Sequence, residues 1–258
     1  MYSINIRITT INQNLEALAK QLYDYWFVQF DFPNEEGKPY KSSGGAMVWN
    51  DKLKREIPES WNVQKLGEIL ILLKDGTHNP PKRIEFGVPL LTGTMFGDNF
   101  LDYTKATFIS AEDYKSIHSQ YQPQEGDILL TKIGTLGNVN YLRQKDVPIA
   151  IHCNSALLRF PIEWGKHYPY FSCKSELFKL RLKAVKGQSI QEFASLERIA
   201  SIITECPNLT VISHFNNIVG PIFDQLILNT IQIESLTKQR NELLPLLMNG
   251  QVSLPNCD

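Results

Sequence analysis

The stretch that decides the fold is HFNNIVGPIFDQLILNTIQIESLTKQRNELLPLLMN, residues 214–249. Its apolar side chains alternate in steps of three and four residues, the pattern of a helix that packs along a partner helix. One row holds Val219, Leu226, Ile233 and Leu247, and the other holds Phe215, Ile222, Leu236 and Leu243. Asn229 and Arg240 fall in the same pattern, where polar residues fix the register of pairing. At about 1.5 Å per residue the helix would be a rod of roughly 45–50 Å, which suits a spacer or a dimer seam.

The N-terminal segment repeats this pattern. Its apolar residues step by four and three, at Ile4, Ile8, Ile11, Leu15, Leu18, Leu22 and Tyr25. The spacing predicts a helix over residues 10–30, although ordinary packing on a globular core would explain one such helix equally well. Two of them in heptad register favour an antiparallel coiled coil. The side chains expected in this seam, or at a contact with a partner, are Leu15, Leu22, Leu226, Asn229, Ile233, Leu236, Arg240 and Leu243.

Between the two helices, composition separates a linker from one domain. Proline and glycine are frequent in residues 31–45, which predicts a surface linker. Short apolar runs cut by glycine and proline then predict a mainly β domain, with helical patterning at residues 168–186 and 191–204. The expected fold class is α+β, with one mainly β domain between two long helices. The expected segments are residues 1–32, 33–60, 61–208, 209–250 and 251–258, which are helix, linker, domain, helix and tail.

Composition limits the class of protein. Hydrophobic residues make up 43% of the chain, enough for a substantial core, and the net charge of −1 does not by itself indicate a nucleic-acid partner. The four cysteines form no CxxC pair, and no window approaches the roughly 20 apolar residues of a membrane span. We therefore expect a soluble, cytoplasmic protein.

Enzyme signatures are absent from the sequence. It holds no GxxxxGK[ST], GxGxxG, HExxH or GxSxG motif, and its five histidines lack the spacing of metal ligands. We therefore expect no catalytic residue, no metal site and no cofactor bound by this chain.

Three stretches of the domain carry side chains that suit nucleic acid. Residues 75–83, DGTHNPPKR, hold donors for base edges and phosphates, although a solvated loop is an equally good interpretation. Residues 126–139 are an apolar strand, a glycine-bounded turn and a return strand, which alone indicates only a hairpin. Residues 174–186 hold five cations against one acid and lead into GQSIQ, a pattern suited to phosphate contacts beside base contacts. A charged, solvated helix face is the commoner meaning of such a run.

Together these stretches resemble the specificity subunit of type I restriction–modification enzymes. Residues 14–33, NLEALAKQLYDYWFVQFDFP, are similar to the end of that family's central conserved helix. Residues 37–61 are similar to the lead into its second target recognition domain, and residues 236–252 to its distal conserved helix. The chain departs from the family pattern because it has a single recognition domain between two helices. It therefore resembles half a subunit.

The resemblance implies sequence-specific recognition of double-stranded DNA without chemistry. A methylation subunit would dock on the helices and a restriction subunit would cleave, with S-adenosylmethionine and ATP with magnesium bound by those partners. A half-subunit is expected to form a homodimer that recognises a two-part, palindromic site. The alternative is a coiled-coil dimer that carries a protein-binding β module. The side chains expected at DNA are Lys74, Thr77, His78, Lys82, Thr92, Lys132, Thr135, Asn138, Lys183, Lys186, Gln188, Ser189 and Gln191, with the four lysines at 74, 132, 183 and 186 as phosphate contacts.

Overall fold

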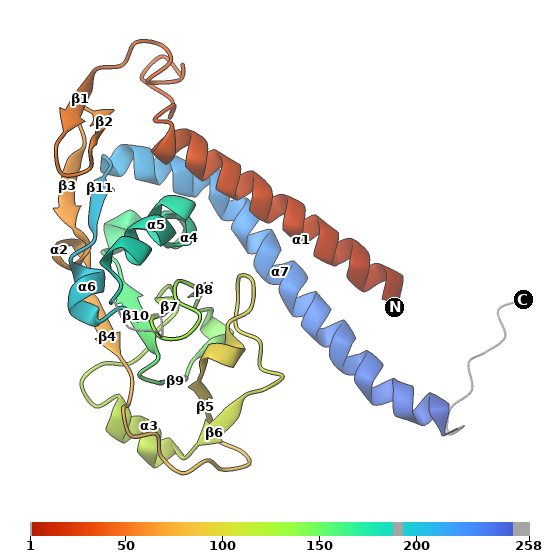
Figure 1. The fold of residues 1–258 in the computed structure, drawn as a ribbon. Helices are drawn as coiled ribbons and strands as arrows, with labels where there is room; N and C mark the ends of the chain where they lie inside the picture. The colour runs from red at the N-terminus through yellow and green to blue at the C-terminus, as the bar shows by residue number, and fades with distance from the viewer. Residues whose placement is uncertain (1, 188–192, 250–258) are drawn as a thin grey trace, which may run out of the picture. The chain divides into compact units, whose positions relative to one another are not determined.

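A computed structural model describes residues 2–187 and 193–249 of the chain (Figure 1). The chain divides into two compact units. The helix-pair unit consists of Met1–Leu22 and Asn217–Asp258, and the central unit is Tyr23–Asn216. The expected combination of helices and sheets is confirmed. Within the described ranges, no helix is both long and apolar enough to span a membrane.

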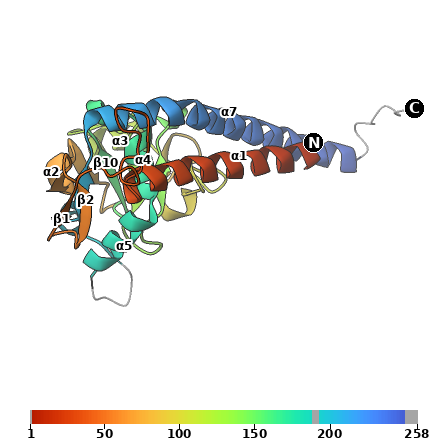
Figure 2. The ribbon, with the colours of Figure 1, turned by 90° about the horizontal axis from the view of Figure 1, so that it is seen from above.

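The helix-pair unit contains α1 (Tyr2–Tyr23) and most of α7 (Leu209–Met248). The prediction of one long C-terminal helix is confirmed, and this helix has 40 residues with Pro221 and Pro245 inside it. Figures 1 and 2 show α1 and α7 side by side and running in opposite directions. A short π-helical turn, η1 (Asp24–Val28), continues the chain after α1.

A buried polar contact joins the two helices. The side chain of Asn229 donates to Asn12 Oδ1 at 2.8 Å, and Asn12 Nδ2 donates to Thr230 Oγ1 at 3.4 Å. Asn229 also accepts from Gln225 Nε2 at 2.8 Å, so its amide is paired on both sides. Because mispairing would leave these amides buried without partners, the contact fixes the register of the pair.

The predicted seam of α7 is buried along only part of its length. Leu226 and Asn229 are buried, and Ile233 and Leu236 are half-buried. Arg240 and Leu243 are exposed, so they do not pack against α1, and a contact of either with a partner stays a prediction. The reason for this exposure is length, since α1 has 22 residues and α7 has 40. The side chain of Leu247 lies outside the described part of the chain.

The seam of α1 is rotated by one residue from the predicted one. Ile11 and Leu18 are exposed, Leu18 by 52%, whereas Asn12 and Ala19 face inward together with Leu15. The amide of Asn12 has a partner on α7, so this polar residue takes the seam position that the apolar pattern assigned to Ile11. Leu15 and Leu22, the two α1 residues expected in the seam or at a partner contact, are both half-buried. The side chain of Ile4 is not among those described.

The central unit is built on two larger and two smaller sheets. The four-stranded sheet is antiparallel and has the order β4-β10-β7-β8: Leu72–Asp75, Ser155–Arg159, Ile128–Thr131 and Val139–Tyr141. The three-stranded sheet has the order β6-β5-β9, Thr107–Ile109, Val88–Leu91 and Ala150–Ile151, with β5 and β9 parallel. One two-stranded sheet pairs β1 (Met47–Asn50) with β2 (Arg55–Pro58), and the other pairs β3 (Asn62–Lys65) with β11 (Ile203–Cys206).

The run of apolar residues at 128–130 becomes the buried middle of the larger sheet. All four residues of β7 are buried, because β10 and β8 flank it. Leu129 joins a core cluster that also contains Leu91, Ile151 and Leu157, so the two larger sheets share a core. The predicted hairpin over residues 126–139 is confirmed, since Leu130 of β7 pairs with Val139 of β8.

Helices are more frequent in the central unit than expected. They are α2 (Leu66–Ile69), α3 (Ala111–Ile117), α4 (His167–Lys174), α5 (Glu176–Val185) and α6 (Leu196–Ala200), with the 3₁₀ turns η2 (Gly93–Met95), η3 (Gln144–Asp146) and η4 (Ile162–Trp164). Two expectations need correction. The segment at 33–60 is not only a linker, because it contains the β1–β2 hairpin, and residues 203–204 are in a strand rather than a helix. Isoleucine and threonine are β-branched, and pairing with β3 favours the strand.

Candidate nucleic-acid interface

One end of the four-stranded sheet brings together the stretches that the sequence singled out. Strands β4 and β7 end there and β10 begins, since Asp75 pairs with Ala156 and Thr131 pairs with Ser155. The loop after β4 and the turn after β7 therefore leave the sheet at the same end. This end also receives the segment after β9, because the backbone of Thr77 forms a parallel bridge with His152.

The loop after β4 lies directly on the backbone at the end of β9. The N–H of Thr77 donates to the carbonyl of Ile151 at 2.9 Å, and the N–H of Cys153 donates to the carbonyl of Thr77 at 3.1 Å. A Cβ atom at Gly76 would lie 1.6 Å from the Ile151 oxygen, so no side chain fits at this position. The glycine allows the loop to start in contact with β9.

The turn between β7 and β8 is held by one hydroxyl. Thr131 Oγ1 accepts from the N–H of Asn138 at 2.9 Å and donates to the carbonyl of Thr135. Gly134 and Gly137 have positive φ angles of 82° and 93°, a backbone conformation that other residues rarely adopt. The side chains of Thr135 and Asn138 are exposed on this turn.

The segment that follows α5 starts and ends beside the same turn. The N–H of Gly187 donates to the carbonyl of Phe193 at 2.9 Å, and Phe193 forms an antiparallel bridge with Ile133. The N–H of Ala194 donates to the carbonyl of Lys132 at 3.0 Å. The predicted contacts Gln188, Ser189 and Gln191 lie outside the described residues, but the residues that flank them are next to the β7–β8 turn.

The structure argues against Lys132 as a phosphate contact. Its side chain is buried, with the whole residue 4% exposed, and Nζ lies 2.7 Å from Asp75 Oδ2 and 5.6 Å from the ring centroid of Phe193. A buried ammonium needs a counter-ion, and Asp75 supplies one. Lys132 therefore ties the end of β7 to the end of β4 from inside.

The other predicted cations are on the surface. Lys74 on β4, Lys82 on the loop, and Lys183 and Lys186 at the end of α5 are all exposed, as is His78, whose Nε2 lies 3.4 Å from Asp75 Oδ2. Arg83, which was not among the predicted contacts, is exposed too and adds a further cation to the loop. Burial lowers the pKa of His152, and the charge of nearby Arg83 lowers it further. The loop therefore adds positive potential at this end of the sheet.

The two predicted threonine contacts have hydroxyl partners inside the protein. Thr77 Oγ1 donates to the carbonyl of Asn79 at 2.9 Å and shapes the turn. Thr92 Oγ1 lies 2.9 Å from Thr94 Oγ1, and Thr92 follows Leu91, which pairs with Ile151. Both residues are at the same end of the sheets, where they support the loops. That any of these side chains contacts DNA stays a prediction.

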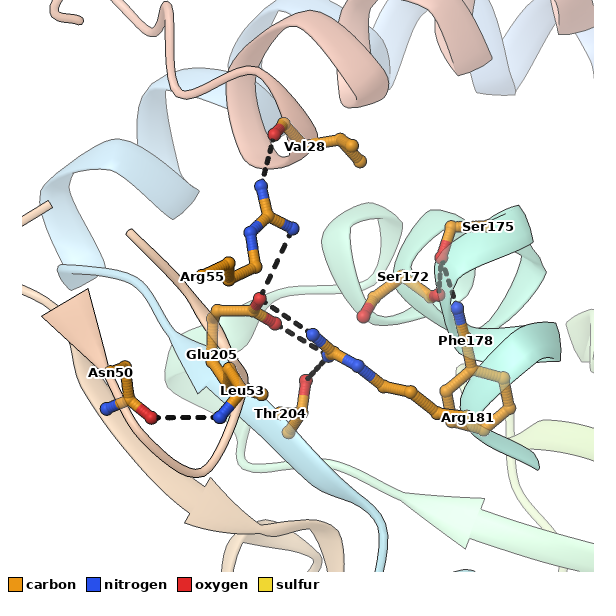
Figure 3. Close-up of polar contacts among 10 residues, drawn as sticks. All are labelled: Val28, Asn50, Leu53, Arg55, Ser172, Ser175, Phe178, Arg181, Thr204 and Glu205. Carbon is orange, nitrogen blue, oxygen red and sulfur yellow. Dashed lines mark hydrogen bonds and ion pairs between the residues drawn. The ribbon is translucent and has the colours of Figure 1, made fainter. Parts of the chain in front are cut away.

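A buried ionic cluster lies elsewhere in the central unit (Figure 3). The Glu205 carboxylate on β11 accepts from Arg181 of α5 at 2.6 and 2.7 Å and lies 3.7 Å from Arg55 of β2. Arg55 also donates to the carbonyl of Val28 at 2.6 Å, and burial lowers its pKa. The cluster fixes α5, whose last turns carry exposed lysines. Sequence reasoning missed it, because no local spacing connects these residues.

His118 provides a pH-dependent contact behind the interface. It is buried at the end of α3, and its Nε2 accepts from the N–H of Ile151 at 3.2 Å, so that nitrogen is unprotonated. Burial lowers its pKa to about 4. Because the unfolded chain binds the proton near pH 6.5 and the folded chain does not, the stability contributed is full above pH 6.5 and is lost as the pH falls toward 4.

We expect the free energy of unfolding to fall between pH 6.5 and pH 5, with a slope that approaches one proton per molecule near pH 5. Urea unfolding at several pH values in this window measures the slope. The control is His118→Gln, which keeps an acceptor for the Ile151 N–H and does not titrate, so its slope should be flatter. An equal slope in both proteins would contradict the assignment.

Known proteins with similar sequences indicate what this chain is related to. No protein-family profile matches the chain. The specificity subunit of the type I restriction enzyme MjaIX of Methanocaldococcus jannaschii is 28% identical over 253 residues, which cover 93% of this chain and 54% of the relative. The MjaVIII specificity subunit of the same organism is 23% identical over 254 residues, which cover 96% and 57%. The chain is a homologue of type I restriction enzyme specificity subunits.

A solved structure agrees with this homology at the level of the fold. The S subunit of a type I restriction–modification system from M. genitalium aligns with a TM-score of 0.53 at 18% identity, over 94% of this chain and 58% of that chain. This specificity-subunit homologue spans about half the length of the curated relatives that it matches. In the described ranges, no cluster of three or more His, Cys, Asp and Glu side chains could hold a metal ion.

Proposed function

We propose that this chain is a half-length specificity subunit that recognises one part of a DNA site and performs no chemistry itself. The observation that carries the proposal is the gathering of three loops at one end of the sheets of a specificity-subunit homologue, with exposed cations on the loop after β4 and at the end of α5. Loops on a rigid sheet are a common platform for recognition. Phosphates would contact the exposed lysines, and bases would contact side chains on the turn between β7 and β8.

The helix-pair unit would serve assembly. We propose that α1 and α7 form an antiparallel coiled coil on which a methylation subunit docks, and that a restriction subunit joins the complex. S-adenosylmethionine and ATP with magnesium would be bound by those partners. Two copies related by a two-fold axis would present two recognition domains, so the target would be a palindrome. A strictly asymmetric target would contradict this arrangement.

A second candidate function is a dimeric module that binds another protein. The net charge of −1 and the exposed apolar side chains of Ile11 and Leu18 on α1 favour it. Salt separates the two functions, because binding to DNA releases counter-ions and weakens steeply with salt, whereas a protein interface need not.

We expect Lys82→Ala and Lys183→Ala to weaken binding to all duplex sequences alike. Each should also reduce the slope of log binding constant against log salt concentration by about one. Each change removes one exposed cation from the surface. Fluorescence anisotropy with a random-sequence duplex between 50 and 200 mM salt, for the chain alone and with a methylation subunit, measures the slope.

The matched control for these variants is Lys52→Ala. Lys52 is also exposed but lies between β1 and β2, away from the loops at the sheet end (Figure 1). Its slope should equal that of the unaltered protein. Binding that does not change with salt in the unaltered protein would favour the protein-binding module.

A further inference from the structure

Phe86 is a large apolar side chain held in solvent. The residue is 80% exposed and lies on the connection between β4 and β5. Lys82 and Arg83 on the same connection are exposed, against one exposed acid nearby, Glu85. An exposed phenylalanine loses the stabilisation that burial would give, and exposed apolar surface of this kind often marks a binding site.

The backbone on both sides of Phe86 is fixed to β6. The N–H of Ile84 donates to the carbonyl of Phe108 at 2.9 Å, and Val88 pairs with Ile109. A Cβ atom on Gly87 would lie 2.2 Å from the Ile109 oxygen, so the chain runs against the strand there. Phe86 therefore sits between two anchors no more than two residues away, which holds the ring outward before any partner arrives.

Two of the other exposed apolar side chains have an acid beside them. Ile162 is 87% exposed and precedes Glu163, and the indole N–H of Trp49 donates to Asp51 at 3.1 Å. The Phe86 connection differs because its two cations can hold a phosphate backbone beside the ring. Cations that contact phosphates next to an exposed apolar side chain are the combination with which proteins wedge base steps apart.

We propose that Phe86 is a wedge that inserts between stacked base pairs of duplex DNA, an inference that rests on the proposed DNA-binding function. The ring would unstack one step, and flexible pyrimidine–purine steps would accept it at the lowest cost. Phe86 would thus contribute to the choice of sequence without hydrogen bonds to bases. Lys82 and Arg83 would hold the adjacent phosphates.

The test measures DNA unwinding as well as affinity. The full chain, alone or with a methylation subunit, is bound to a relaxed closed-circular plasmid, topoisomerase is added, and the change in linking number is read on a gel. The unaltered protein is expected to change the linking number. Phe86→Ala should abolish that change and weaken binding to a random-sequence duplex by about tenfold, with an unchanged salt slope. Phe86→Trp should retain the unwinding.

Ile162→Ala is the matched control, because it removes an equally exposed apolar side chain from a different surface, and it should leave unwinding and affinity unchanged. If Phe86→Ala binds and unwinds like the unaltered protein, or if the unaltered protein binds without unwinding, the wedge is overturned and the proposed function stands. If the unaltered protein binds no duplex, either alone or with a methylation subunit, the proposed function fails and the wedge fails with it.

Discussion

Replacing Glu205 with alanine is expected to lower the free energy of unfolding by about 3 kcal/mol, a fall in Tm of roughly 6–12 °C for a domain of this size. The carboxylate is 8% exposed and accepts two hydrogen bonds from Arg181, with Arg55 as its second cation. Its removal leaves two partly buried guanidinium groups without a counter-ion, and their desolvation is no longer offset. Thermal and urea unfolding measure the loss.

Two further variants separate burial from pairing. Glu176→Ala breaks the exposed pair between Glu176 and Lys179, where the loss should stay under about 0.5 kcal/mol. Replacing Arg55, Arg181 and Glu205 together by methionine, methionine and leucine should destabilise less than Glu205→Ala, because apolar side chains leave no buried charge unpaired. A Glu205→Ala loss no larger than that of Glu176→Ala would show that the cluster contributes little.

Gly76→Ala is expected to destabilise the central unit by about 3 kcal/mol, the upper end of the usual range for overpacking, and to abolish DNA binding. The added carbon would lie 1.6 Å from the Ile151 oxygen and 2.7 Å from the His152 nitrogen. Both atoms are backbone, so no side-chain rotation relieves the overlap and the loop must leave β9. Urea unfolding measures stability, and hydrogen exchange of the Thr77 amide reports the loop contact.

Gly93→Ala is the control for this substitution. A Cβ atom on Gly93 meets nothing within 4 Å, and its φ is not positive. The variant should therefore unfold and bind like the unaltered protein, within about 0.5 kcal/mol. Equal behaviour of the two alanine variants would contradict the close approach at Gly76.

Periodicity in the sequence predicted the elements whose partners are local or repetitive. The long helix followed from apolar steps of three and four, and the β7–β8 hairpin followed from an apolar strand before a turn with glycines at 134 and 137. In both, each residue's environment depends on neighbours a few positions away. Local pattern therefore suffices.

Distant contacts decided the features that the pattern missed. The seam of α1 turned toward Asn12 because its amide partner is Asn229, and Lys132 became internal because Asp75 ends the strand two positions away in the sheet. The cluster around Glu205 combines three segments with no common motif. Such placements depend on topology, which a single sequence does not state.

The pairing of β3 with β11 has a consequence for how such chains can evolve. Cys206 lies opposite Asn62, so the two ends of the segment between β3 and β11 lie side by side. A different sequence between those two strands could be grafted in without lengthening or shortening the path from α1 to α7. Recombination at the two short strands would therefore exchange the loops that we propose to contact DNA and leave the sequences of α1 and α7 unchanged.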